Sequence, residues 1–272
     1  MMSTTTAVTN SAPEQWWQQR TLPEGQVLHC RLGPLNLSVW RSDGEWRMAW
    51  DREPEGEDRA SAILELEAVD FSPDEFERHV FARATGKLQL RPGLLDRAVV
   101  ARPVTPLFIP AGESTTLYLS TPLSIFVDVE ELPVTLREIP VLRLSDTWFG
   151  PNSRQGDLCY AVRTRARHRL EEVPRRAHRA ISAVRIENKA ETALPLEKLS
   201  LPIPALSLYG ATDGSLWTQS LALTRTQDSD LAAMTIDRLP PAAAGATEML
   251  SEPREPSQRG TLVRAFSLFF GD

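Results

Sequence analysis

The chain has 272 residues, a net charge of −6 and 42% hydrophobic residues. This hydrophobic content is enough to build a folded core, so it excludes a wholly disordered chain. No run approaches the roughly eighteen apolar residues of a membrane-spanning helix, and the N-terminal residues lack the basic and apolar regions of a secretory signal.

Residues 1–13 are small and polar, and we expect them to form a flexible tail. The clearest element follows in LNLSVWRSDGEWRMAW, where Asp43-Gly44 predicts a β-hairpin with a two-residue turn. This register gathers four apolar side chains on one face: Leu37, Val39, Met48 and Trp50. It also sets Trp40 opposite Arg47 on the other face, close enough to stack.

Short runs with a period of two predict further strands along the chain. They cover residues 63–69, 87–90, 117–130 and 183–188. In LPLEKLSLPI the apolar positions change from even to odd numbers, which predicts a bulge or bend near Glu197-Lys198. Residues 72–83 have the pattern of a short helix, with Ser72 as its cap and Glu75 three residues on.

The C-terminal part of the chain contains a second turn signal, Asp213-Gly214. We expect a strand after it that includes Trp217, Leu221 and Leu223. Residues 239–260 are rich in proline, alanine, glycine and glutamate, and they predict an exposed loop. The apolar end, LVRAFSLFF, predicts a buried closing strand.

Together these signals indicate an all-β fold of the antiparallel β-sandwich class with few short helices. The 21 prolines against 14 glycines argue against a helical bundle, because proline breaks helix interiors. A proline-rich stretch near residue 110 predicts an N-terminal β domain at 14–110 and a C-terminal β-sandwich domain at 111–272. Whether the chain holds one sandwich or two stays open.

Residues 163–179 hold seven arginines and two glutamates, although the chain as a whole is acidic. If residues 158–170 form a strand, apolar side chains share one face and Cys159 and alternate arginines share the other, whereas a helix would scatter these arginines. We therefore predict an anion-binding surface, because arginine suits bidentate recognition of phosphate or carboxylate. Its members are Arg163, Arg165, Arg167, Arg169, Arg175, Arg176 and Arg179. The alternative is an outer sheet face whose arginines pair with the protein's own acids.

No catalytic, nucleotide-binding or metal-binding motif occurs in the sequence, so we assign no catalytic residue, cofactor or metal. His29 and Cys30 are adjacent, but neighbouring strand residues point to opposite faces and cannot easily share a metal. We expect the two cysteines to be reduced in a cytoplasmic protein, with one long-range disulfide as the alternative. On an exposed arginine face the pKa of the Cys159 thiol would fall, whereas a half-buried thiol would be inert.

The segment LSDTWFGPNSRQGDLCY, residues 144–160, predicts a loop with two large aromatic side chains. Trp148 and Phe149 could cover the end of a sandwich core, or they could form a ligand platform with Cys159 next to the arginines. Nucleic acid is disfavoured as a partner because the chain is acidic and has no recognition motif. An acidic protein surface or anionic lipid headgroups remain as partners, and the oligomeric state is undetermined.

Four phrases carry a resemblance to a known family: TLYLSTPL, LRLSDTWFGPNSRQGDLCYA, LEKLSLPIPALSLYG and SLWTQSL. Over about residues 80–225 the chain resembles a prokaryotic domain-of-unknown-function family, number 432. The resemblance implies a β-rich, non-secreted protein without assigned catalytic residues. Genes of such proteins often lie beside those of small-conductance mechanosensitive channels, which implies a soluble accessory to a channel or to the envelope.

Two hypotheses about function follow. The first is a non-enzymatic interaction or regulatory module whose arginine face meets an anionic partner. The second is a small-molecule or carbohydrate-binding module, or an unfamiliar enzyme, with its ligand between Trp148-Phe149 and the arginine strand. A flat charged face would favour the first, and a deep pocket with a carboxylate or histidine would favour the second.

Overall fold

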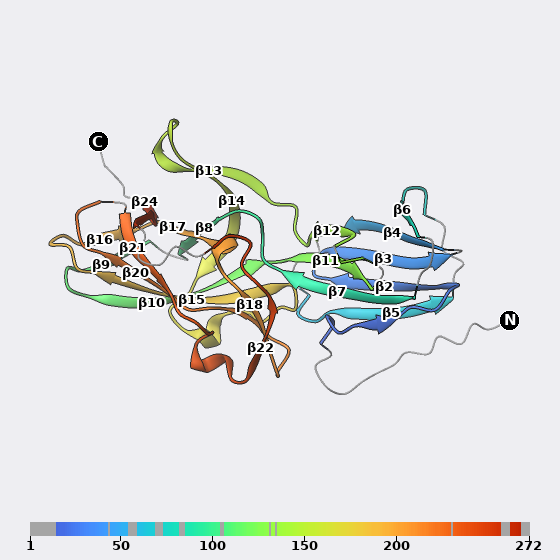
Figure 1. The fold of residues 1–272 in the computed structure, drawn as a ribbon. Helices are drawn as coiled ribbons and strands as arrows, with labels where there is room; N and C mark the ends of the chain where they lie inside the picture. The colour runs from blue at the N-terminus through green and yellow to red at the C-terminus, as the bar shows by residue number, and fades with distance from the viewer. Residues whose placement is uncertain are drawn as a thin grey trace. The chain divides into compact units, whose positions relative to one another are not determined.

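The computed structural model describes residues 15–42, 44–53, 59–68, 73–81, 85–103, 106–130, 132–133, 135–229, 231–256 and 262–267. Strands dominate these residues, so the predicted all-β fold is confirmed. Within this part of the chain, no helix is long and apolar enough to cross a membrane. The chain forms two compact units (Figure 1). Unit 1 contains residues 1–93, 123–142 and 176–178, and unit 2 contains residues 94–122, 143–175 and 179–272.

Unit 1 consists of a four-stranded and a five-stranded sheet. The first has the order β1-β7-β11-β12: β1 (Arg20–Thr21), β7 (Lys87–Gly93), β11 (Ser124–Val129) and β12 (Arg137–Pro140). The second has the order β5-β2-β3-β4-β6: β5 (Ile63–Ala68), β2 (Gln26–Leu32), β3 (Leu35–Ser42), β4 (Glu45–Arg52) and β6 (Glu77–Val80). β3 and β11 bury the apolar face that the period-two pattern predicts, as Leu37 and Val127 illustrate. At the edge of the five-stranded sheet, Ile63 and Leu66 of β5 are exposed instead.

The β3–β4 hairpin has the predicted register. Val39 pairs with Met48 and Ser42 pairs with Glu45, although Asp43 lies outside the described residues. Gly44 has a φ of +74°, which suits a hairpin turn of this kind. On the other face, the ring centres of Phe76 and Trp40 lie 5.5 Å apart. The Arg47 guanidinium lies 5.7 Å from the centre of the Phe76 ring. Phe76 therefore packs beside Trp40 and Arg47 on this face of the hairpin, a contact that the hairpin register alone does not predict.

The predicted helix at residues 72–83 is wrong. Residues Glu77–Val80 form β6, which pairs antiparallel with β4, while Ser72 lies outside the described residues. A segment of twelve residues has only a weak preference for helix. Pairing with the open edge of β4 satisfies its backbone groups and brings Phe76 over Trp40, so tertiary contacts decide its conformation.

Unit 2 contains an eight-stranded, a five-stranded and a two-stranded sheet. The eight-stranded sheet has the path β22-β18-β19-β15-β20-β21-β23, with β10 also beside β15: β22 (Thr247–Ser251), β18 (Leu208–Ala211), β19 (Leu216–Thr218), β15 (Arg179–Asn188), β20 (Leu221–Arg225), β21 (Leu231–Ile236), β23 (Leu262–Arg264) and β10 (Ser114–Pro122). The five-stranded sheet has the order β13-β14-β8-β17-β24: β13 (Ser145–Asn152), β14 (Gln155–Ala166), β8 (Val99–Pro103), β17 (Lys198–Leu201) and β24 (Phe266–Ser267). The two-stranded sheet joins β16 (Leu194–Leu196) to β9 (Leu107–Ile109).

The change of apolar phase near Glu197 marks a break between two strands. β16 pairs with β9, and after Glu197 the chain continues as β17 beside β8 and β24. Leu196 and Leu199 are both fully buried, so one residue between the strands lets both bury their apolar side chains. The predicted bend is therefore confirmed, and its cause is a strand that changes sheets.

Two C-terminal predictions need correction. The strand expected from Trp217 to Leu223 is divided into β19 and β20, and both pair in parallel with β15. The loop expected at residues 239–260 contains β22, which pairs with β18, and a 3₁₀ turn at Ala242–Ala244. Backbone hydrogen bonds to β18 account for the order in this alanine-rich segment.

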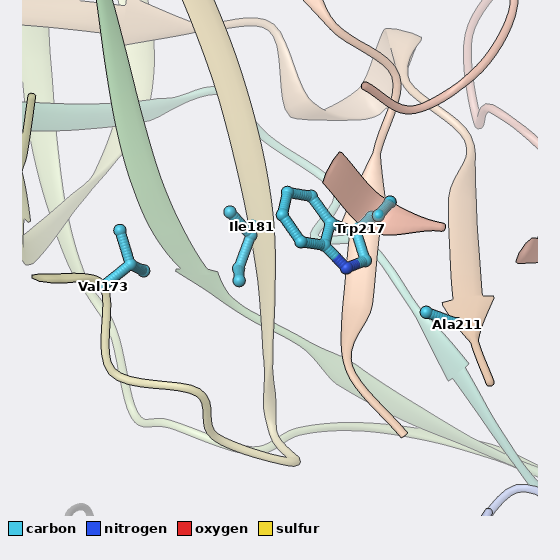
Figure 2. Close-up of a cluster of buried hydrophobic side chains, with 5 residues drawn as sticks. Val173, Ile181, Ala211 and Trp217 are labelled. Carbon is cyan, nitrogen blue, oxygen red and sulfur yellow. The ribbon is translucent and has the colours of Figure 1, made fainter. Parts of the chain in front are cut away.

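A buried cluster around Trp217 holds the segment that joins β14 to β15. Figure 2 shows Trp217 beside Ile181, with Val173 and Ala211 nearby. Val173 follows a 3₁₀ turn at Leu170–Glu172 and is only 6% exposed. The arginine-rich segment is therefore anchored to the core of unit 2 at its centre.

Candidate functional site

Strand β14 carries the first half of the arginine-rich segment, as predicted, but it ends at Ala166. Beyond it, Arg167 forms an isolated antiparallel bridge with Tyr118 of β10, and the chain then bends into the 3₁₀ turn. The expected strand to residue 170 is thus wrong at its end. The backbone groups of Arg167 exchange hydrogen bonds with those of Tyr118, at 2.8 and 3.0 Å, which draws the chain from one sheet to another.

The register of β14 against β8 brings in an arginine that the sequence reading missed. These strands are parallel, and Arg165 lies directly opposite Arg102. Ala161 pairs with Val100 and Arg165 pairs with Arg102, so β14 has two more residues than β8 between these pairs. Because two residues are one full period of a strand, the insertion does not change which backbone positions of β14 correspond to each face of β8. Arg102 is exposed. No local signal in the sequence reveals this pairing, because β8 and β14 are some sixty residues apart.

We use the name arginine face for Arg102, which lies opposite Arg165 of β14, and for Arg167 and Arg169, which follow the end of that strand. Arg102 and Arg169 are exposed, and Arg167 is partly exposed. Among the residues that the structure describes, no acidic side chain forms an ion pair with any of the three. The backbone of Arg163 and Arg165 belongs to the same strand, while their side chains lie outside the description.

The other three predicted arginines have different surroundings. Arg175 pairs with the Asp213 carboxylate, and Arg179 is buried and donates from Nη1 to the Ser120 carbonyl at 3.0 Å. Arg176 belongs to unit 1, whereas the others belong to unit 2. The internal pairing that the sequence reading held as an alternative thus applies to Arg175, and Arg179 stabilises the fold.

The three residues of the predicted platform do not share a surface. Trp148 and Phe149 lie in β13 rather than in a loop, so they point to opposite faces. Trp148 is 47% exposed opposite Leu158, whereas Phe149 and Cys159 are buried in a cluster with Val100. Burial raises the pKa of the Cys159 thiol, with a further contribution from Asp157, which is opposite to the fall expected on an exposed arginine face.

A polar cluster lies on the Trp148 side of the hairpin. The Tyr160 hydroxyl donates to Asp96 Oδ1 at 2.8 Å, and the Arg97 guanidinium lies 5.2 Å from the Tyr160 ring centre. Arg97 also pairs with Asp146 at 2.9 Å. Burial, followed by the hydrogen bond to Asp96, raises the pKa of Tyr160 to about 12. This hydroxyl therefore stays protonated near neutral pH and is unsuited to act as a general base.

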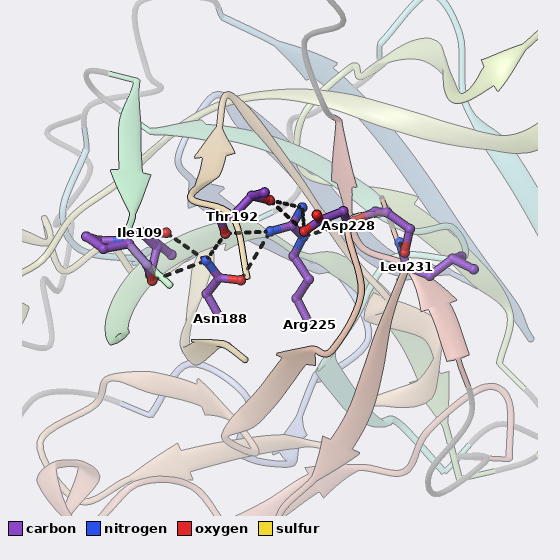
Figure 3. Close-up of polar contacts among 8 residues, drawn as sticks. Ile109, Asn188, Thr192, Arg225, Asp228 and Leu231 are labelled. Atoms are coloured by element: carbon purple, nitrogen blue, oxygen red, sulfur yellow. Dashed lines mark hydrogen bonds and ion pairs between the residues drawn. The ribbon is translucent and has the colours of Figure 1, made fainter. Parts of the chain in front are cut away.

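Arg225 is the most buried arginine among the residues of unit 2 that the structure describes, and it is part of the fold. Figure 3 shows Arg225 donating to Asn188 Oδ1 and to the Thr192 carbonyl, both at 3.1 Å. It also donates from Nε to the Ser229 carbonyl at 3.3 Å and pairs with Asp228 at 3.3 Å. Arg225 thus joins the end of β15 to two loops, one at Thr192 and one at Asp228–Ser229, through a network that occupies its guanidinium and leaves little capacity for a ligand.

Within the described ranges, no three His, Cys, Asp or Glu side chains are grouped so that they could hold a metal ion. His29 and Cys30 lie on opposite faces of β2, since His29 is partly exposed and Cys30 is buried. Burial raises the pKa of Cys30 to about 12, so its thiol stays protonated.

Comparison with known proteins gives one match. The sequence model of a family described as "Protein of unknown function (DUF432)" matches residues 16–270, a longer range than the resemblance seen in the sequence. No curated protein and no solved structure matches the chain.

Proposed function

Since this chain belongs to the DUF432 family, which carries no assigned activity, we propose a function from its surface: it is a non-enzymatic interaction module whose arginine face binds an acidic protein surface. The exposure of Arg102 and Arg169 carries this proposal, because no acidic side chain among the described residues forms an ion pair with either of them. An anionic partner would supply the missing counter-charge. Guanidinium groups also suit bidentate hydrogen bonds to carboxylates.

The placement of apolar side chains favours a protein over a lipid bilayer. Stable attachment to a bilayer usually needs a basic patch together with an apolar anchor. The large exposed apolar residues of the hairpin, Trp148 and Leu158, lie on the face opposite to that of Cys159. Through Ala161 and Val100, the register assigns Arg102 to the Cys159 face. The exposed apolar side chains of the hairpin therefore lie on the face opposite to Arg102, and the cytosolic domain of a channel is one partner that the family resemblance suggests.

The geometry around Trp148 supports a non-enzymatic role. A ligand between Trp148, Phe149 and the arginines would need these groups to converge, yet Phe149 and Cys159 are covered by Val100. Tyr160 and Cys159 both have raised pKa values, so neither supplies a base or a nucleophile at neutral pH.

The test measures binding of fluorescently labelled polyglutamate to the full chain at low and high ionic strength. Replacing Arg102, Arg167 and Arg169 with serine should abolish the salt-sensitive binding, because exposed charge pairs weaken as salt screens them. The thermal midpoint should stay nearly unchanged, since surface substitutions away from special features usually change stability by less than about 0.5 kcal/mol.

The matched control removes three arginines that are exposed and already paired: Arg31, Arg78 and Arg137. Binding should survive in this control. Equal loss in both triple variants would show a general charge effect and refute the proposal. Binding to vesicles of anionic lipid but not to polyglutamate would replace the acidic protein with a membrane surface.

A further inference from the structure

Lys198 continues the arginine face onto a third strand. It is the first residue of β17, and the next residue, Leu199, lies opposite Ala101 of β8. Because these two strands are antiparallel, Lys198 lies beside the residue that follows Ala101, which is Arg102. Leu199 and Ala101 are both fully buried. Lys198 is partly exposed and Arg102 is exposed, so burial also assigns them to one face, opposite to that of the buried pair.

Three adjacent strands thus carry a basic residue at neighbouring positions, because Arg165 of β14 lies opposite Arg102. We call Lys198, Arg102 and Arg165 the basic row. Within the part of the chain that the structure describes, no acidic side chain forms an ion pair with Lys198 or with Arg102. Neighbouring strands are about 4.8 Å apart, so the row crosses the strands and its two ends are about 10 Å apart at the backbone.

The strands of the basic row lie inside their sheet. In the order β13-β14-β8-β17-β24, each of β14, β8 and β17 has a neighbouring strand on both sides. A partner cannot bind here by adding a strand of its own, because strand addition needs a free edge with unpaired backbone groups. Recognition at the basic row must therefore use side chains.

Given the proposed function, on which this inference rests, we propose that the acidic surface is an α-helix whose carboxylates form a stripe across β14, β8 and β17. Acidic residues at positions i, i+3 and i+7 of a helix span about 10.5 Å along its axis, close to the length of the basic row. Alternate residues of an extended strand, at i, i+2 and i+4, span about 13 Å and fit the row less well. Lys198 is then a further binding residue of this face.

Two labelled peptides of the same composition test the arrangement of charge. Both are alanine-rich helices with the same number of glutamates, and circular dichroism verifies that they are equally helical. In the striped peptide the glutamates lie at i, i+3 and i+7, and in the scattered peptide they are distributed around the helix. Fluorescence anisotropy with the full chain at low salt should show about tenfold tighter binding of the striped peptide, because only this peptide reaches the whole row at once.

Lys198→Ser should weaken binding of the striped peptide about fivefold, which is the size expected for the loss of one exposed charge pair. Lys198→Arg keeps the charge and should bind as the wild type does. Lys189→Ser is the matched control, because Lys189 belongs to the same unit, is exposed and already pairs with Glu187. Its affinity should equal that of the wild type.

Equal affinity for the two peptides overturns the helix, as does wild-type affinity in Lys198→Ser or an equal loss in Lys189→Ser. If polyglutamate still binds in these cases, the proposed function stands without the helix. If neither the peptides nor polyglutamate bind, both proposals fail. The comparison of the two peptides uses the wild-type chain, so it decides the matter even where a variant unfolds at a lower temperature.

Discussion

Arg225 and Arg175 are both paired with an aspartate, but burial gives the two pairs different roles. The Arg225 side chain is 3% exposed and donates to the end of β15 and to two loops, whereas the Arg175 side chain is 57% exposed and contacts Asp213. Water can replace the partner of an exposed ion but not that of a buried one. The same residue type is therefore part of the core at one position and part of the surface at another.

At the residue scale, we predict that Arg225→Met destabilises unit 2 by about 3–5 kcal/mol. The substitution leaves Asn188 Oδ1 and the carbonyls of Thr192 and Ser229 without this donor. Arg175→Met, the matched control, should cost less than about 1 kcal/mol. Urea unfolding followed by circular dichroism measures both, and equal midpoints for the two variants would contradict the prediction.

Strand β2 is bounded by two glycines that have positive φ angles for different structural reasons. Gly25 has a φ of +77° and open space around its Cα, whereas Gly33 has a φ of +56° and lies against the His178 ring. A Cβ atom at Gly33 would lie 2.7 Å from that ring. Backbone conformation alone therefore requires glycine at the first position, and packing adds a second requirement at the other.

At the scale of this element, we predict that Gly25→Ala costs about 1 kcal/mol, because alanine is strained at positive φ. Gly33→Ala should cost at least about 1 kcal/mol more, because the methyl group must displace His178 from a packed site. Thermal unfolding of the two variants measures the difference. Similar losses would mean that the His178 ring moves aside freely.

Neither unit follows a single stretch of sequence. Unit 1 takes β11 and β12 from beyond residue 122, while unit 2 begins at residue 94. A sequence division at residue 110 therefore separates β7 from β11, its neighbour in the four-stranded sheet. Leu88 and Leu90, which are buried in the intact unit, belong to the strand that loses this neighbour.

For the whole molecule, we predict that a fragment of residues 14–110 does not fold alone. Without β11 and β12 it exposes the apolar face of β7 and an unpaired strand edge. Adding a fragment of residues 111–272 should restore cooperative unfolding, because it supplies the missing strands. Amide NMR spectra of the two fragments, apart and mixed, provide the measurement. Well-dispersed signals from residues 14–110 alone would refute this prediction.

Local rules predicted much of the fold but little of the candidate site. The β3–β4 hairpin and the bend at Glu197 were predictable because turn chemistry and side-chain alternation act between near neighbours. The strand β6 was not, because its backbone is satisfied by β4 rather than within its own segment. The arginines of β14 were visible in the sequence, whereas their neighbour Arg102 was not.

The sequence by itself determined the all-β class, the alternation of faces within each strand and the family to which the chain belongs. Only the tertiary structure decided which strands lie side by side, and therefore that Arg102 joins the arginine face and that Arg179 is buried. The physical reason is the sequence separation over which each interaction acts. Alternation and turn geometry are fixed by bonds between adjacent residues, whereas strand pairing and burial depend on contacts between segments that the sequence keeps far apart.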